Sequence, residues 1–285
     1  MKSFLKIVLE LGKVRISLPV ALSAVAGFVL YSGELNRQGF LMALGVFLMS
    51  CGSGALNHWQ ERKTDALMPR TMKRPIPSGK ITAQTGLLIT LGYLLAGSIV
   101  LLASNPVIAL ILSWVTLLSY NLVYTPLKKI SAFAVIPGSM VGALPPVIGW
   151  AAAGGHVLAE PILIVAAFFF IGQIPHFWLL LLLFGNQYKL AGMPSLTDIF
   201  TKDQITRITY TWVLTTIASA LLVLLFVINN GYILLLLLAY IFYLLFSMSK
   251  TIFLQTEFKV LPAFYKLNFL YLFMMLFLIA DSLLR

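Results

Sequence analysis

Long apolar runs are the feature that most constrains how this chain can fold. About nine of them, each of roughly 20 residues, are separated by short segments that are polar or contain proline and glycine. A run of this length crosses the hydrocarbon of a bilayer as an α-helix, which satisfies its own backbone hydrogen bonds. The expected spans are residues 16–32, 40–57, 85–103, 107–124, 132–153, 162–184, 208–228, 232–253 and 264–284.

The composition excludes a soluble globular protein. Apolar residues make up 60% of the 285 residues and charged residues only 10%, whereas about half of a soluble domain is apolar and about a quarter is charged. The single cysteine, Cys51, lies inside an apolar run, so we expect no disulfide framework and no cysteine-based metal site. The sequence therefore predicts an all-α polytopic membrane protein that forms one membrane-embedded domain over residues 1–285.

The distribution of basic residues predicts the orientation in the membrane. If the N-terminus is cytoplasmic, only Arg37 and Arg285 lie outside, and the other 18 of the 20 Lys and Arg residues lie in cytoplasmic segments. We therefore expect a protein of the plasma (inner) membrane whose two longer polar loops face the cytoplasm. Because the charges are spread over short loops, the net charge of +11 does not indicate a nucleic-acid partner.

The most charged segment follows the second apolar run. Asn57, Glu61 and Asp65 are spaced four residues apart, so their side chains share one face if the helix continues that far. Oxygen ligands of this kind suit a divalent cation such as Mg²⁺. Solvation at a membrane interface explains scattered Lys and Arg residues, but it explains an amide and two acids at helical spacing less well.

Basic residues follow this helical face closely. Arg70, Lys73 and Arg74 come within ten residues of Asp65, and Lys80 lies a little further on. Charge-assisted hydrogen bonds from such side chains suit a phosphate group that a cation on Asp65 also touches. The segment therefore predicts a site for a phosphate-bearing ligand at the end of a membrane helix.

Five stretches of the sequence carry distinctive motifs. The first is Asn57-x3-Glu61-x3-Asp65 followed by the run 74–79, RPIPSG. The others are residues 124–129 (YTPLKK), 142–150 (GALPPVIGW), 173–178 (QIPHFW) and 188–196 (YKLAGMPSL). Together they cover most of the chain from the second span to the loop after the sixth. They resemble the UbiA superfamily of membrane prenyltransferases, and within it the haem O synthase branch, the protohaem IX farnesyltransferases.

The resemblance implies a fold and an activity. The fold is a UbiA-type bundle of nine helices with a central cavity and cytoplasmic cap loops. The activity is Mg²⁺-dependent transfer of a farnesyl group from farnesyl diphosphate to the vinyl group of protohaem IX (haem b), which gives haem O. These are expectations drawn from the resemblance.

The resemblance also implies roles for individual residues. Mg²⁺ would be held by Asn57, Glu61, Asp65 and Asn186, and the diphosphate by Lys63, Arg70, Lys73, Arg74 and Lys128. The aromatic faces of Tyr124, Trp150, Phe177 and Tyr188 would stabilise the allylic cation or contact the acceptor. His176 lies within an apolar run, and two roles stay open for it: a ligand of the haem iron, or a hydrogen bond between helices.

The chain departs from the branch pattern at its second signature. Where haem O synthases carry an acidic pair just before the tyrosine, this sequence has Asn186 and Gln187 before Tyr188. Amide oxygens bind Mg²⁺ less strongly than carboxylates, so we expect a weaker second metal site. Asp198 and Asp203 lie further along the chain as alternative acids.

Three other functions remain to be weighed. A quinone or chlorin acceptor is compatible with the same scaffold. The missing acids favour a catalytically weakened homologue that binds haem or lipid. A transporter would place acids or broken helices at the middle of the membrane, whereas the acids here cluster at the ends of the spans.

Overall fold

The computed structural model describes residues 2–253 and 259–285, and this part of the chain forms helices and no strands. Nine helical segments within it are long and apolar enough to cross a membrane. The prediction of an all-α protein with nine spans is therefore confirmed.

The first half of the chain forms α1 (Lys2–Leu11), α2 (Val14–Ser32), α3 (Arg37–Asp65), α4 (Ala83–Ser104), α5 (Val107–Leu118), η1 (Ser119–Tyr124), α6 (Thr125–Leu127), α7 (Val135–Gly138) and α8 (Met140–Ala152). The second half forms α9 (Glu160–Leu190), η2 (Leu196–Asp198), α10 (Lys202–Phe226), α11 (Gly231–Phe253) and α12 (Val260–Leu283). Two segments that we call the first and second cap segments, residues 66–82 and 191–201, connect spans at one end of the bundle.

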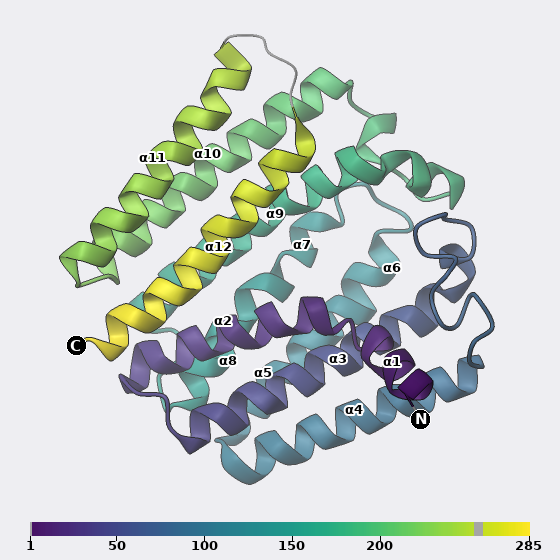
Figure 1. Ribbon diagram of the computed structural model, residues 1–285, viewed down its shortest axis with the longest axis horizontal. Helices are drawn as coiled ribbons and strands as arrows, with labels where there is room; N and C mark the ends of the chain where they lie inside the picture. Colours follow the sequence, from purple (N-terminus) through teal and green to yellow (C-terminus); the bar gives the residue numbers. More distant parts are fainter. Residues whose placement is uncertain (1, 254–258) are drawn as a thin grey trace.

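The spans form a ring that α12 closes (Figure 1). α2 packs on α3 and α8, α3 packs on α4, and α8 packs on α5 and α9. The chain then continues from α9 through α10 and α11 to α12. Because α12 contacts both α9 and α2, the last span meets the first.

Two glycines let α2 and α8 approach until their backbones touch. A Cβ atom added to Gly27 would lie 1.9 Å from the carbonyl oxygen of Pro146, and one added to Gly149 would lie 1.8 Å from the carbonyl oxygen of Ala24. Small residues are usual where helices pack within a bilayer, because close van der Waals contact drives association there. These glycines therefore set the spacing of the first and fifth spans.

We expect Gly149→Val to lower the free energy of unfolding by about 3 kcal/mol, because the added side chain overlaps the backbone of α2. Gly92→Val is the matched control, since a Cβ atom at Gly92 in α4 meets nothing within 4 Å. Thermal unfolding of both purified variants in one detergent measures the difference. Equal melting temperatures would contradict the close contact between α2 and α8.

Two spans are interrupted. The fourth runs through α5, the π-helix η1 and α6, and the fifth through α7 and α8. π-helical turns are rare and often occur at functional sites. Irregular backbone within a membrane is tolerated where it is buried in protein or lines a cavity. The apolar length of these runs did not indicate the π-helix.

The outer faces of the spans carry apolar side chains. On α4, for example, Leu88, Leu95 and Ile99 are 68%, 63% and 64% exposed. Exposed apolar area on this scale marks a surface that contacts other apolar matter, and on helices of spanning length that matter is lipid. The protein is therefore an integral membrane protein.

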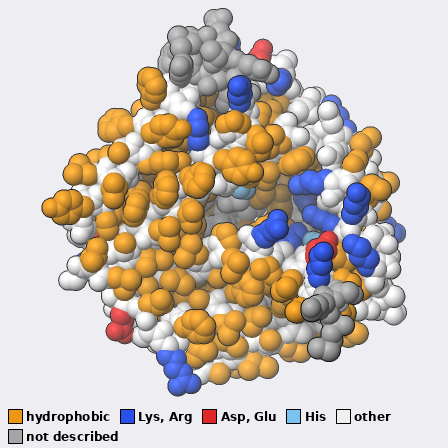
Figure 2. All heavy atoms as spheres, in the orientation of Figure 1, with side chains coloured by type: hydrophobic (Ala, Val, Ile, Leu, Met, Phe, Trp, Pro, Cys, Tyr) orange, Lys and Arg blue, Asp and Glu red, His pale blue; other side chains and the backbone are white. Residues whose placement is uncertain are grey.

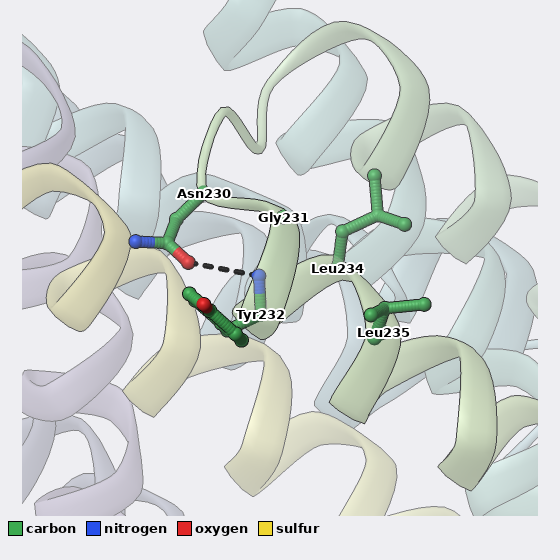
Figure 3. A pocket seen from close by; sticks show the side chains of 5 residues that line it. All are labelled: Asn230, Gly231, Tyr232, Leu234 and Leu235. Carbon is green, nitrogen blue, oxygen red and sulfur yellow. Dashed lines mark hydrogen bonds between the residues drawn. The ribbon is translucent and has the colours of Figure 1, made fainter.

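The turn between α10 and α11 is fixed by α12. Asp281, 1% exposed, accepts hydrogen bonds from the backbone amides of Asn229 and Asn230 at 2.9 and 2.6 Å, and it pairs with Arg285 at 2.8 Å. Asn230 Oδ1 accepts from the amide of Tyr232 at 3.0 Å (Figure 3). The open pocket here is lined by Asn230, Gly231, Tyr232, Leu234 and Leu235. No charged residue lines this pocket. The hydrogen bonds of Asp281 join α12 to the turn between α10 and α11, so the turn holds the last three spans together.

Candidate active site

Three oxygen-bearing side chains lie on one face of α3 near its C-terminus. Asn57, Glu61 and Asp65 are spaced four residues apart, and α3 continues unbroken to Asp65. Their exposed fractions are 1%, 5% and 1%. The helix therefore brings together, and buries, the amide and the two carboxylates that the sequence singled out.

Both carboxylates are paired with basic side chains from other segments. Arg74 of the first cap segment donates from Nη1 to both oxygens of Asp65, at 2.7 and 2.9 Å. Lys128, which follows α6, places Nζ 2.5 Å from Glu61 Oε1. Burial alone would lower the pKa of Lys128, but the Glu61 carboxylate outweighs it and raises the pKa above its ordinary value. A buried carboxylate needs such a partner because desolvation penalises its charge.

Asn57 is paired with a basic residue that sequence reasoning did not place in the site. Lys13 Nζ donates a hydrogen bond to Asn57 Oδ1 at 2.6 Å. The stem of Lys13 passes beside Gly54 of α3, where an added Cβ atom would lie 3.4 Å from it. On its other side, the Asn57 amide donates to Thr125 Oγ1 at 3.2 Å. The amide therefore joins the α1–α2 link to α6.

The backbone of Lys13 explains how its side chain reaches the site. Lys13 separates α1 from α2 and adopts a left-handed conformation, with φ 46° and ψ 46°. It is the one non-glycine residue with positive φ in the described part of the chain, and such strain is typical of functional positions. Burial lowers its pKa from 10.5 to about 7, and the charge of Arg74 acts in the same direction. The available signal in the sequence was a lysine just before the first apolar run.

A second missed residue, Asn121, fixes the π-helix η1 to α3. Asn121 is 0% exposed. Its Nδ2 donates to the Ser53 carbonyl at 3.1 Å and to Gln60 Oε1 at 3.0 Å, and its Oδ1 accepts from Ser53 Oγ at 2.7 Å. Gln60 Nε2 returns a bond to the Asn121 carbonyl at 2.9 Å. This network holds the turn from which Tyr124 and Lys128 project. A lone asparagine in an apolar run was its signal in the sequence.

Aromatic rings extend the site away from the charges. Tyr124 is 8% exposed and stacks on Tyr120, with ring centroids 5.6 Å apart. Lys128 Nζ lies 5.5 Å from the Tyr124 ring centroid. The ring of Phe177 on α9 follows, with its centroid 5.5 Å from that of Tyr124. The faces of these rings can stabilise a positive charge near them.

His176 lies beyond Phe177 on α9. Its ring is 5.8 Å from Phe177 and 4.9 Å from Phe264 of α12. A side-chain hydrogen bond joins His176 to Asn268, while His176 Nδ1 is buried without a hydrogen-bond partner. The histidine thus makes the cross-helix bond that the sequence allowed and keeps a free nitrogen among aromatic side chains.

The second signature supports the first cap segment. Gln187 Oε1 accepts a hydrogen bond from the backbone amide of Arg70 at 3.2 Å, and the Arg70 guanidinium lies 4.5 Å from the Phe184 ring centroid. Tyr188 is half-buried and lies close enough to Lys128 to help raise the pKa of that lysine. Gln187 therefore joins the end of α9 to the first cap segment.

Other residues singled out by the sequence lie apart from this group. Lys63 is exposed, because two residues from Glu61 it points about 200° around α3. Lys73 and Asn186 are exposed as well. Trp150 lies near the opposite end of the bundle, where its Nε1 donates to the His156 carbonyl at 3.0 Å and its ring contacts Tyr31. Their site roles stay predictions.

Asp198 is engaged in its own turn. Its Oδ1 pairs with Lys189 at 2.7 Å, and its Oδ2 accepts from the backbone amide of Ser195 at 2.9 Å. The hydrogen bond from Lys189 lowers the pKa of this carboxyl. Asp203 is exposed in the first turn of α10. Both oxygens of Asp198 thus already have partners within the second cap segment.

A hollow opens near the middle of the face seen in Figure 2. Lys and Arg side chains gather along one side of it, and a histidine shows at its rim. Apolar side chains cover the surrounding surface. The opening therefore has a basic side and an apolar side.

The α3 face fits a metal that shares its ligands with a substrate. No three His, Cys, Asp or Glu side chains gather as a metal site within residues 2–253 and 259–285. Mg²⁺, however, usually takes one or two carboxylates and completes its shell with phosphate oxygens and water. Glu61 and Asp65 supply two buried carboxylates on one face of α3, and Asn57 adds an amide oxygen. The donor set is therefore suitable for Mg²⁺ bound together with a phosphate group.

Known proteins resemble this chain in sequence and in fold. It is 38% identical to a protoheme IX farnesyltransferase of Oleidesulfovibrio alaskensis over 65% of this chain and 66% of that one. It is 36% identical to a protoheme IX farnesyltransferase of Cytophaga hutchinsonii over 72% and 71%. The chain thus aligns with about two thirds of each relative's length.

Similarity of fold extends over the whole chain. A UbiA homolog from Archaeoglobus fulgidus, solved with GPP and Mg²⁺ bound, superposes with a TM-score of 0.69 at 16% identity, covering 98% of this chain and 100% of that one. The profile of the UbiA prenyltransferase family matches residues 17–276. This protein is therefore a member of the UbiA prenyltransferase family.

Proposed function

We propose that this prenyltransferase moves the farnesyl group of farnesyl diphosphate to a vinyl group of protohaem IX, giving haem O. Relatives at 36–38% identity carry this activity in their names. The observation that carries the proposal is the continuous series from the α3 carboxylates through Lys128, Tyr124 and Phe177 to His176. Two aromatic rings, Tyr124 and Phe177, then join the donor site to the acceptor site.

The donor side follows from the charges. Glu61, Asp65 and Asn57 would hold Mg²⁺, which when bound withdraws charge from the diphosphate and makes it a better leaving group. Arg74 and Lys128 give charge-assisted hydrogen bonds to its oxygens. An anionic head and an apolar tail match the basic and apolar sides of the hollow in Figure 2. The Archaeoglobus fulgidus protein of the same fold was solved with GPP and Mg²⁺.

The acceptor side follows from the rings. When the bond between the farnesyl C1 and the diphosphate oxygen breaks, Tyr124 and Phe177 offer their faces to the allylic cation. C1 then bonds to the terminal vinyl carbon, and water adds to the resulting cation and loses a proton. His176 has a buried nitrogen without a partner, which suits a ligand of the haem iron.

The protein's setting is part of the proposal. The positive-inside pattern supports a cytoplasmic N-terminus in the plasma (inner) membrane, with both cap segments on the cytoplasmic side. The contact of α12 with α2 supports a single domain over residues 1–285. Farnesyl diphosphate would then reach the basic side of the hollow from the cytoplasm.

Mass spectrometry of the haem fraction tests the proposal. Membranes containing the expressed protein are incubated with haem b, farnesyl diphosphate and Mg²⁺, and matched membranes without the protein are the control. We expect a haem whose mass has increased by one farnesyl group and one hydroxyl group.

Two other outcomes would reject the assignment in different ways. Unchanged haem, with haem still bound by the purified protein, would favour a catalytically weakened haem-binding homologue, for which the amides at Asn186 and Gln187 are the supporting observation. Unchanged haem without haem binding would favour a quinone or chlorin acceptor.

A further inference from the structure

Asn57, Glu61 and Asp65 on the α3 face each have a basic partner in this structure. Lys13 donates to the Asn57 amide oxygen, Lys128 pairs with Glu61, and Arg74 donates to both oxygens of Asp65. The basic partners come from three separate segments: the α1–α2 link, the end of α6 and the first cap segment. Three basic side chains therefore face two carboxylates and one neutral amide, so no negative charge on this face lacks a basic partner.

A metal ion alone would meet opposition in this arrangement. It needs the lone pairs that Lys13 and Arg74 already use, and it adds positive charge next to basic groups. A diphosphate alone would meet the buried carboxylates of Glu61 and Asp65, which repel it. Each ligand, however, removes the obstacle to the other, because the metal takes the carboxylates and the diphosphate accepts the released donors.

We propose that Lys13, Arg74 and Lys128 exchange their partners on α3 for the oxygens of the diphosphate, so that the divalent cation and the diphosphate bind strongly only as a pair. The inference rests on the diphosphate site of the proposed function and adds Lys13 to it as a positioning residue. The strained left-handed backbone of Lys13 is consistent with this role, since it holds the side chain on Asn57.

Binding of Mn²⁺, measured by electron paramagnetic resonance with and without inorganic pyrophosphate, tests the exchange. In the wild-type protein we expect pyrophosphate to tighten Mn²⁺ binding by about a hundredfold. Lys13→Met frees Asn57 Oδ1 and removes one donor to pyrophosphate. Mn²⁺ alone should then bind more tightly, and the coupling should fall by about tenfold.

Two further variants test whether misfolding, or the loss of any nearby positive charge, explains the result. Lys13→Gly suits the left-handed backbone, so it should fold at least as well as Lys13→Met and lose the same coupling. Lys129→Met removes an exposed charge next to Lys128 and should keep the full coupling. Reciprocity requires that Mn²⁺ tighten pyrophosphate binding by the same factor.

The outcomes separate this inference from the proposed function. Wild-type Mn²⁺ binding that does not respond to pyrophosphate, or a folded Lys13→Met variant with full coupling, would overturn the exchange. Neither measurement contains a farnesyl group or haem, so a failure to form farnesylated haem with coupling intact would reject the acceptor and leave the exchange standing.

Discussion

Glu61→Gln should lower the turnover of farnesyl diphosphate by on the order of 10³-fold, because it removes a charged ligand at the point where negative charge develops on the leaving group. The substitution keeps the size of the side chain. It removes the negative charge of the group that lies 2.5 Å from Lys128 Nζ, so the fold must be checked. Turnover with haem b at fixed Mg²⁺, measured beside a thermal unfolding curve, checks the prediction.

Glu10→Gln is the matched control for this change. Glu10 carries the same side chain at an exposed position on α1. We expect its turnover to equal that of the wild type. A folded Glu61→Gln variant with turnover within about fivefold of the wild type would exclude Glu61 from the reaction, since one such group typically contributes 10² or more.

His176→Ala should weaken haem binding by about a hundredfold, or on the order of 3 kcal/mol, while leaving pyrophosphate binding unchanged. The reason is position: His176 lies among Phe177, Phe264 and Tyr271 on the far side of Tyr124 from the charged cluster. Titration of haem b, followed through its absorption spectrum, checks the affinity and reports a change of iron ligand.

His156→Ala is the control for the acceptor side. His156 lies in the loop between α8 and α9, at the opposite end of the bundle from the cap segments. If His176→Ala bound haem as tightly as His156→Ala and with the same spectrum, His176 would be confined to its hydrogen bond with Asn268.

The spans could be predicted from the sequence because lipid imposes one strong rule. Backbone groups must be satisfied within each segment, so apolar length alone predicts nine helices, and nine such segments are found in the part of the chain that the structure describes. The same rule says nothing of local irregularity. The π-helix at Ser119–Tyr124 depends on hydrogen bonds from Asn121 to α3, across more than 60 residues of sequence.

The candidate site was predictable where it lies on one helix. The four-residue spacing places Asn57, Glu61 and Asp65 on one face, and α3 continues far enough to keep them there. The environment of these residues was not predictable: the sequence places Asp65 at the end of a membrane helix, but only the structure shows that the first cap segment folds back and leaves it 1% exposed against Arg74. From the sequence, Lys13 was only one of the basic residues that predict the orientation in the membrane. Nothing in its spacing indicates that its backbone is left-handed and joins α1 to α2.

The position of the metal tests the central claim most directly. A structure solved with Mn²⁺ and farnesyl thiodiphosphate, a slowly reacting substrate analogue, would locate the ion by its anomalous scattering. We predict a peak at about 2.1 Å from carboxylate oxygens of Glu61 and Asp65 and shared with the diphosphate, with Lys128 and Arg74 turned to the diphosphate oxygens. A peak beside Asn186 or Asp198, with none between Glu61 and Asp65, would contradict a reaction organised on α3.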